Sequence, residues 1–118
     1  MNIKSISQQF SVGNFDTVFE FLSDEVTWEV MGASAIFLDG KDAVIEYCSN
    51  VARYFASVET QFNEDTVLVD GNKVAITGSA KFSRDGNVIS LVDSCDVFLF
   101  DSAGKLMKIT SYCIQSEL

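Results

Sequence analysis

Residues 88–100, with the sequence VISLVDSCDVFLF, give the clearest indication of the fold. Alternate residues of a β-strand point to opposite faces of the sheet. The two sets are Val92, Ser94, Asp96, Phe98 and Phe100 on one face, and Leu91, Asp93, Cys95, Val97 and Leu99 on the other. Both faces are mostly apolar, whereas a sheet with one face in water shows a polar side. We therefore expect the chain's own helices to cover one face and a second subunit to cover the other.

The same period of two extends to both sides of this strand. It recurs over residues 58–69, 74–82 and 106–114, and the intervening segments DGN, DGN and DSAG are turn sequences. Strands joined by short turns pair antiparallel with their neighbours in sequence. The second half of the chain therefore predicts a meander of four long strands.

The first half of the chain is predominantly helical in its spacing. Apolar residues recur every three to four positions over residues 3–12, 15–22 and 40–55. Residues 26–30 alternate strictly and predict one short strand at the edge of the sheet, and residues 31–38 read as a connecting segment. This order predicts a single α+β domain over residues 1–118, with the helices gathered on one face of an antiparallel sheet.

Composition and charge exclude several classes of function. The chain has 118 residues, with 8 Lys and Arg against 17 Asp and Glu, so its formal net charge is −9. Such a field repels nucleic acid and anionic membranes, so neither is expected as a partner. The chain contains no His, which removes Ser-His-Asp and Cys-His catalysis and the commonest metal ligand. We therefore expect no metal and no cofactor.

The cysteines and the hydropathy pattern indicate a cytoplasmic protein. Cys48, Cys95 and Cys113 are odd in number and widely spaced, so we interpret them as free, mostly buried thiols in a reducing compartment rather than as a disulfide framework or a catalytic thiol. The start of the chain lacks the apolar segment of a signal peptide. No run of about 18 apolar residues predicts a membrane span.

Gly78 interrupts a predicted strand. A glycine there favours a bulge or bend that lets a long sheet curl, rather than the close approach of a ligand. A strongly curled sheet around helices makes a cone with an open end. We expect a pocket at that end.

Asp96 is the candidate functional residue because it interrupts an apolar face just before Phe98 and Phe100. A carboxylate in such a place must be hydrogen-bonded, paired or protonated, and burial raises its pKa. One interpretation is a pocket acid that bonds to a ligand oxygen. The other is a structural residue that bonds a neighbouring strand, a turn or a dimer partner. Asp93 points to the opposite face, so the two do not form a carboxylate pair.

Aromatic residues supply the rest of the candidate pocket. Trp28, Tyr47 and Phe82, with Met31 and Phe37, are candidates to line an apolar pocket, although an aromatic stripe is more often part of an ordinary core. Ser111 and Cys113 share one face of the last strand.

Three segments in order resemble the SnoaL-like, nuclear transport factor 2-like superfamily: GNFDTVFEFLSDEVTWE (13–29), LDGKDAVIEYC (38–48) and CDVFLFDSAGKLMKITSYC (95–113). The resemblance implies a cone-shaped, curved sheet wrapped around the N-terminal helices, a pocket at its mouth and dimers through the outer sheet face. Together with the residues above, it implies the following pocket: Trp28, Val30, Tyr47, Phe82, Asp96, Phe98 and Cys113.

The ketosteroid isomerases of this superfamily offer a test of activity. They use a carboxylate base at the end of the first strand, a Tyr on the first helix and a protonated Asp on the long strand. The aligned positions here are Val30, about Ile6 and Asp96, so only the hydrogen-bonding Asp is matched. The cyclases of the superfamily commonly use a His, which this chain lacks.

Three functions remain open at this point. The first is binding of a small, largely apolar molecule with Asp96 as polar anchor. The second is an enzyme of isomerase, cyclase or dehydratase type that uses Asp96 as acid or base. The third is a non-catalytic dimerisation module with a filled pocket. An open cavity of some hundreds of Å³ favours the first over the third.

Overall fold

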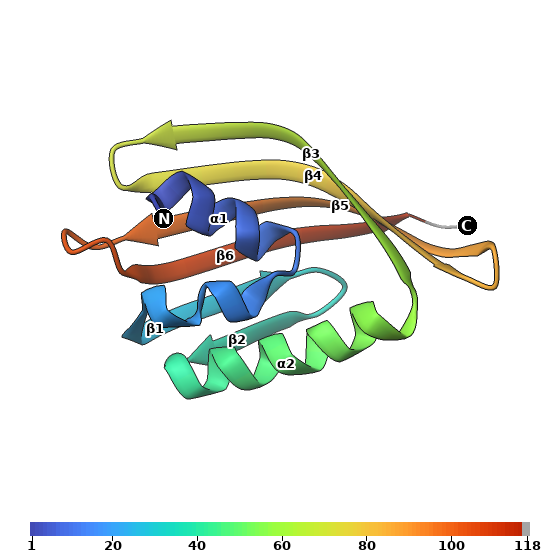
Figure 1. Cartoon of the computed structure of the whole chain (residues 1–118), viewed down its shortest axis with the longest axis horizontal. Coiled ribbons are helices and arrows are strands. Elements are labelled where there is room, and N and C mark those ends of the chain that lie inside the picture. Colours follow the sequence, from blue (N-terminus) through green and yellow to red (C-terminus); the bar gives the residue numbers. More distant parts are fainter. Residues whose placement is uncertain (117–118) are drawn as a thin grey trace.

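A computed structural model of the chain describes residues 1–116, and within these residues a six-stranded sheet carries its helices on one face (Figure 1). Two short 3₁₀ turns, Phe15–Thr17 and Phe19–Phe21, follow the first helix. The helices and strands are α1 (Ile3–Ser11), β1 (Leu22–Met31), β2 (Ala35–Asp39), α2 (Lys41–Ser57), β3 (Glu59–Asp70), β4 (Lys73–Arg84), β5 (Asn87–Phe100) and β6 (Leu106–Ser116).

The strand order is β2-β1-β6-β5-β4-β3, and the predicted meander β3–β6 is confirmed. The sheet is nevertheless mixed, because β1 pairs in parallel with β6, with Trp28 beside Ile109 and Val30 beside Ser111. The prediction of a purely antiparallel sheet with the short strand at its edge was therefore wrong. Alternation identifies which residues share a face, but it carries no information about which strand lies alongside or in which direction.

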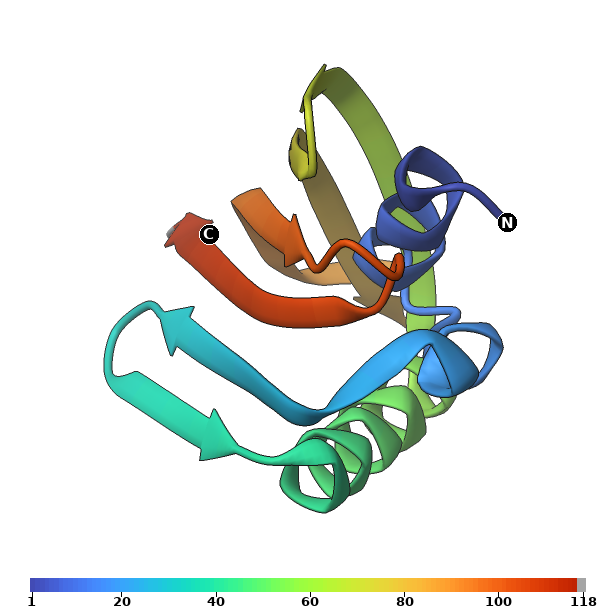
Figure 2. The ribbon, with the colours of Figure 1, turned by 90° about the vertical axis from the view of Figure 1, so that its left-hand side faces the viewer.

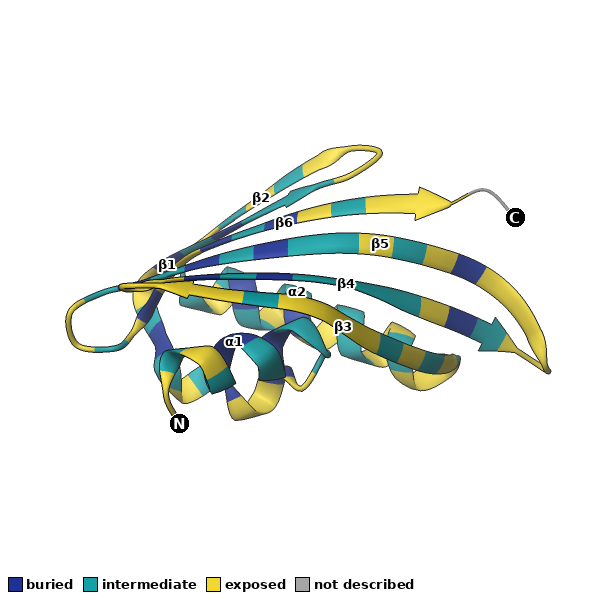
Figure 3. Cartoon of the chain, turned by 90° about the horizontal axis from the view of Figure 1, so that it is seen from above, coloured by how far each residue is buried: buried dark blue, intermediate teal, exposed yellow. Residues whose placement is uncertain are grey.

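The sheet curls strongly around α1 (Figure 2). Figure 3 shows both helices on the same side of the sheet. Within residues 1–116, no helix covers the opposite side. This arrangement confirms the α+β, cone-like fold predicted from the sequence. Its concave inner face is the one that carries Asp96, Phe98 and Phe100, all three of which are buried.

Helix α1 has a defined start and end. The side-chain oxygen of Asn2 accepts a hydrogen bond from the backbone N–H of Ser5 at 2.8 Å and so caps the first turn. The helix ends before Gly13, whose φ of +82° is one that residues with a Cβ seldom adopt. The chain therefore turns sharply just after Ser11 and brings the end of α1 against the sheet.

Residues 15–22 do not form the predicted α-helix. Phe15 and Val18 are buried as expected, but they lie in and beside the two 3₁₀ turns, and Leu22 already belongs to β1. A spacing of three residues fits one turn of a 3₁₀ helix as well as part of an α-helix. The apolar pattern thus predicted the buried face correctly and the type of helix incorrectly.

Residues 31–38 also differ from the sequence prediction of a connecting segment. Gly32, Ala33 and Ser34 form the loop of a hairpin, and the following residues form β2, which pairs with β1 from Met31↔Ala35 to Thr27↔Asp39. The small residues of the loop obscured a strand only five residues long.

Gly78 lies where β3 and β4 approach each other most closely. It pairs with Glu64, and the register shifts immediately afterwards, so that Asp65 is an extra residue on β3. A Cβ on Gly78 would lie 2.5 Å from the backbone oxygen of Asn63, which is well inside contact distance. The predicted bulge is therefore present, on the partner strand, and Gly78 permits the close backbone contact beside it.

Two further sequence expectations concern cysteines and membranes. All three cysteines are free, with Cys48 buried and Cys95 and Cys113 half-buried. Burial raises the pKa of the Cys48 thiol to about 12, which leaves this thiol protonated and unreactive at neutral pH. Within residues 1–116, no helix has both the length and the apolar character needed to cross a membrane.

We predict that Gly78→Ala destabilises the protein by about 1–3 kcal/mol, because the added methyl group must displace backbone rather than a flexible side chain. Urea unfolding measures the effect. Gly32→Ala is the matched control, since a Cβ there meets its nearest neighbour, the Cys113 backbone oxygen, at an ordinary 3.4 Å. Equal stability of the two variants would contradict the proposed close approach.

Candidate functional site

A cavity of about 270 Å³ lies between the end of α1, the middle of α2 and the concave face of the sheet. Its lining comes from the end of α1, the first 3₁₀ turn, β1, α2 and all four strands of the meander. Most of the lining is aromatic or aliphatic. The polar side chains that reach it are Ser11, Tyr47, Ser94, Asp96, Ser111 and Cys113.

The structure places most of the sequence-predicted pocket residues around this cavity. Those that line it are Trp28, Val30, Tyr47, Phe82, Asp96 and Cys113. Phe98 does not line it, because its ring lies one layer deeper, fully buried in the core against Phe10. Met31 and Phe37 also lie elsewhere, since their registers put them on the outer face of the sheet.

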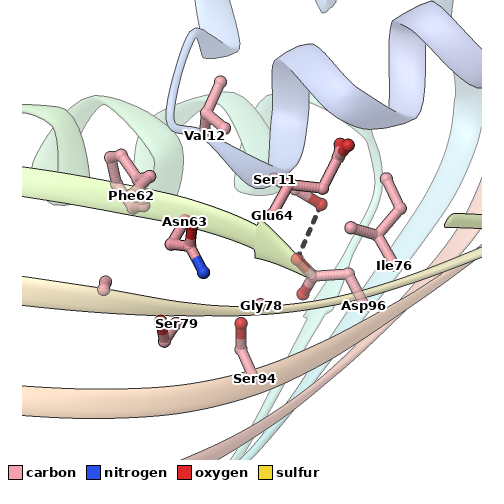
Figure 4. A pocket seen from close by; sticks show the side chains of 11 residues that line it. Ser11, Val12, Phe62, Asn63, Glu64, Ile76, Gly78, Ser79, Ser94 and Asp96 are labelled. Carbon is pink, nitrogen blue, oxygen red and sulfur yellow. Dashed lines mark hydrogen bonds between the residues drawn. The ribbon is translucent and has the colours of Figure 1, made fainter. Parts of the chain in front are cut away.

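Asp96 projects from the middle of β5 into the interior and is 9% exposed. Its Oδ2 accepts a hydrogen bond from the hydroxyl of Ser11 at 2.8 Å, drawn as a dashed line in Figure 4. The hydroxyl of Ser111, directly opposite on β6, also bonds to the carboxyl. Asp96 therefore ties the end of α1 to the two central strands of the sheet.

Trp28 completes this network. Its Nε1–H donates to Ser111 Oγ at 2.9 Å. An indole N–H can only donate, so Ser111 accepts from Trp28 and keeps its own proton for Asp96. The bonds thus run from Trp28 to Ser111 to Asp96, with Ser11 as a second donor to the carboxyl. Among the described residues, every buried side-chain nitrogen and oxygen has a partner.

Burial has the largest effect on the pKa values of the side chains in the site. It raises the pKa of Asp96 above its ordinary value, and the hydrogen bonds from Ser111 and Ser11 act in the opposite direction. Burial also raises the pKa of the Cys113 thiol, with a contribution from the negative charge of Asp96. The pKa of Tyr47 is raised by burial and then by its neighbours Cys113 and Cys48. Tyr47 and Cys113 are consequently neutral at pH 7, and neither is an activated nucleophile.

Aromatic rings make up most of the cavity wall. Phe55 and Phe82 stack with their ring centroids 5.6 Å apart. Trp28 and Tyr47 pack edge to face, with their ring centroids 5.3 Å apart. Phe10, Phe15 and Phe62 complete the ring-lined surface. Such a wall favours a flat or bulky apolar group.

A smaller hollow of about 50 Å³ adjoins Asp96 on the side of β3 (Figure 4). Ser11, Glu64 and Gly78 line it together with Asp96. The carboxylate of Glu64 accepts from the side-chain amide of Gln8, at 3.1 Å to Oε1. Asp96 therefore borders two hollows, and the second one adds another acidic side chain.

Sequence reasoning missed several residues of this site. Ser11 stood only as the penultimate residue of a predicted helix, and nothing in its spacing indicated contact with a residue 85 positions away. Phe55 and Phe62 carried a detectable signal, because each lies on the apolar side of its predicted element. Their convergence depends on how α2 and β3 pack, which periodicity does not describe.

The donor types present do not favour a metal. Within residues 1–116, no group of three or more His, Cys, Asp or Glu residues is placed to hold an ion. The arrangement offers instead one buried carboxyl, two hydroxyl donors that orient it, and an apolar wall.

Comparison with known proteins identifies the family. The sequence profile of the SnoaL-like domain matches residues 5–109. The chain belongs to the SnoaL-like domain family. A search of curated protein sequences gave no match.

Solved structures similar to this SnoaL-like domain agree on the fold. A nuclear transport factor 2-like protein of unknown function from Cytophaga hutchinsonii is 29% identical, with 93% of this chain and 94% of that chain covered and a TM-score of 0.80. A protein from a soil-derived mobile gene cassette is 18% identical over 94% of this chain and 85% of its own, with a TM-score of 0.72. An LEH-like epoxide hydrolase from M. tuberculosis is 21% identical, with 94% of this chain and 81% of that chain covered and a TM-score of 0.67. At these identities the last two establish the fold alone.

We predict that Asp96→Asn changes stability in a pH-dependent way. Because folding raises the pKa of Asp96, the wild-type protein loses stability as pH rises above the unfolded value of about 3.9. Asn cannot ionise and escapes this loss. The free energy of unfolding of the variant relative to wild type should therefore rise between pH 4 and pH 7, by about 1.4 kcal/mol for each unit of pKa shift.

Urea unfolding at the two pH values measures this difference. Asp93→Asn is the matched control, because it removes the same charge from the exposed, opposite face of β5. A variant that loses more stability at pH 7 than at pH 4 would contradict the prediction. That result would show that the hydrogen bonds from Ser11 and Ser111 lower the pKa of Asp96 by more than burial raises it.

Proposed function

We propose that this SnoaL-like domain binds a small, largely apolar molecule in the 270 Å³ cavity, with Asp96 as its polar anchor. The observation that carries the proposal is an open, ring-lined cavity beside one oriented carboxyl. An apolar pocket with a few convergent polar groups is the usual form of a small-molecule site.

The two alternatives explain less of the geometry. A pure dimerisation module needs no cavity, and its core side chains would fill the space. An enzyme that uses Asp96 as general base gains support from the raised pKa of that carboxyl. It lacks, however, an activated partner, because Tyr47 and Cys113 are both neutral at pH 7. We therefore place binding first and proton transfer by Asp96 second.

Partial filling of the cavity tests binding. Ala80 lines the cavity on β4, between Phe62 on one neighbouring strand and Val92 on the other. We predict that the neutral probe 2-naphthol binds wild type and quenches or shifts Trp28 fluorescence. Ala80→Phe should weaken this binding at least about tenfold, a loss of about 1.4 kcal/mol.

Ala56→Phe is the control, since Ala56 is exposed on α2 and away from the cavity. It adds the same ring without occupying the space. Equal affinity of wild type and Ala80→Phe would overturn the cavity as the binding site. Absence of 2-naphthol binding to wild type would count against the proposed function itself.

We further propose a homodimer through the outer face of the sheet. Phe37, Leu68, Tyr112 and Ile114 are exposed on that face. Cross-strand register puts Met31, Tyr112 and Cys95 side by side at its centre. A second copy of the same face is apolar in the same places, and a two-fold contact matches it to itself.

Tyr112→Lys tests this interface, because it places a charge at the centre of the outer face. We predict a dimer for wild type and a monomer for the variant in sedimentation at micromolar concentration. Val69→Lys is the control, since Val69 is an equally exposed apolar residue at the opposite, inner side of β3. A monomeric wild type would remove the proposal.

We infer a reducing, cytoplasmic compartment for the protein. The support is the presence of three free cysteines at separate places in the fold.

A further inference from the structure

The direction of the hydrogen bonds around Asp96 restricts which ligand atoms can bind to its carboxyl group. Trp28 donates to Ser111, Ser111 bonds to Asp96, and Ser11 donates to Asp96 Oδ2. Both protein partners therefore supply protons to the carboxyl. An ionised carboxylate only accepts, and it has about four acceptor positions. The positions left after Ser11 and Ser111 require a donor from the ligand.

The charges around Asp96 favour a ligand group that is positively charged as well as a hydrogen-bond donor. Among residues 1–116, neither a Lys nor an Arg lines the cavity or the adjoining hollow. The ionisable neighbours are Tyr47 on α2, Cys113 on β6 and Glu64 on β3, and none of these carries a positive charge at any pH. The stretch of β4 that faces Asp96 and the end of α1 contribute no charged side chain. The negative charge of Asp96 is thus uncompensated by the protein.

The rest of the wall also favours a cation. Seven aromatic side chains line the cavity: Phe10, Phe15, Trp28, Tyr47, Phe55, Phe62 and Phe82. The negative face of an aromatic ring attracts an ammonium group, most strongly where water is excluded. The chain's net charge of −9 draws cations toward it and repels anions.

We infer that the cavity selects small protonated organic amines, with the ammonium group on Asp96 and the apolar body against the aromatic wall. The inference rests on the proposed function, because it specifies the ligand class of the same cavity. It excludes carboxylates and phosphates, for which the wall offers no cation. It also ranks neutral alcohols and ketones of the same shape below the amine.

Three probes of nearly equal shape test the inference on the wild-type protein: 2-phenylethylamine, 2-phenylethanol and 3-phenylpropanoate. They carry a cationic, a neutral and an anionic head at pH 7. Calorimetric titration should give an affinity for the amine at least about tenfold above that for the alcohol, with the carboxylate weakest. An alcohol that binds as tightly as the amine would overturn the inference.

Variants assign the selectivity to one side chain. Asp96→Asn should lower the affinity for the amine to that for the alcohol, and it should leave the affinity for the alcohol within about threefold. Asp93→Asn removes the same charge from the outer face and should leave the ratio of the two affinities unchanged. Retention of the ratio in Asp96→Asn, or its equal loss in Asp93→Asn, would show a general field effect and overturn the inference.

The pH dependence provides a readout that does not need Asp96→Asn to fold. Affinity for the amine should fall as acidification protonates Asp96, whereas affinity for the alcohol should not. A pH-independent preference for the amine would overturn the inference. Binding of 2-naphthol without binding of the amine would reject the ligand class and leave the proposed function standing. Failure of all these probes to bind would reject both.

Discussion

Phe10 is the side chain that holds helix α1 against the concave face of the sheet. It is 4% exposed, and its ring meets the edges or faces of Phe15, Trp28 and Phe98 at centroid distances of 5.0, 4.9 and 5.7 Å. These partners come from three separate parts of the chain. Burial of such rings stabilises the fold by several kcal/mol in total. The position of α1, and so of the residue that follows Phe10, depends on this cluster.

The candidate site is a direct consequence of that packing. Ser11 follows Phe10, and its hydroxyl reaches Asp96 only because the preceding ring fixes the end of the helix. Gly13 and Phe15, just after the helix, also line the cavity, so the turn that follows α1 forms part of its wall. A dense aromatic core and an open cavity thus share one boundary, where Trp28 packs against Phe10 on one side and borders the cavity on the other.

The two faces of the sheet have separate roles. The concave face buries Asp96 with its hydroxyl donors, and the convex face carries exposed apolar residues such as Phe37 and Tyr112. Strand β5 contributes to both, which explains why neither of its faces is simply polar. At Gly78, beside the bulge at Asp65, β4 approaches β3 so closely that a side chain would collide with the backbone of β3.

Local periodicity in the sequence is enough to predict several parts of this protein. Alternation over residues 88–100 is sufficient to place Asp96 and Phe98 on one face and Asp93 on the other. Turn residues defined the meander, and Gly78 indicated the bend. Trp28, Tyr47 and Phe82 are recognisable as pocket candidates because they are aromatic residues in elements expected to face the interior. Such signals are local, since each depends on residues a few positions apart.

Tertiary structure alone decided how distant elements meet. The parallel pairing of β1 with β6 sets Trp28 beside Ile109, two residues before Ser111 and on the same face of the sheet, and so allows the indole N–H to reach Ser111 Oγ. The bond between Ser11 and Asp96 joins positions 85 residues apart. Periodicity predicts which face a residue occupies, whereas the partner across that face is set by the packing of the whole chain. For that reason the sequence singled out Asp96, and only the fold showed which groups donate to it.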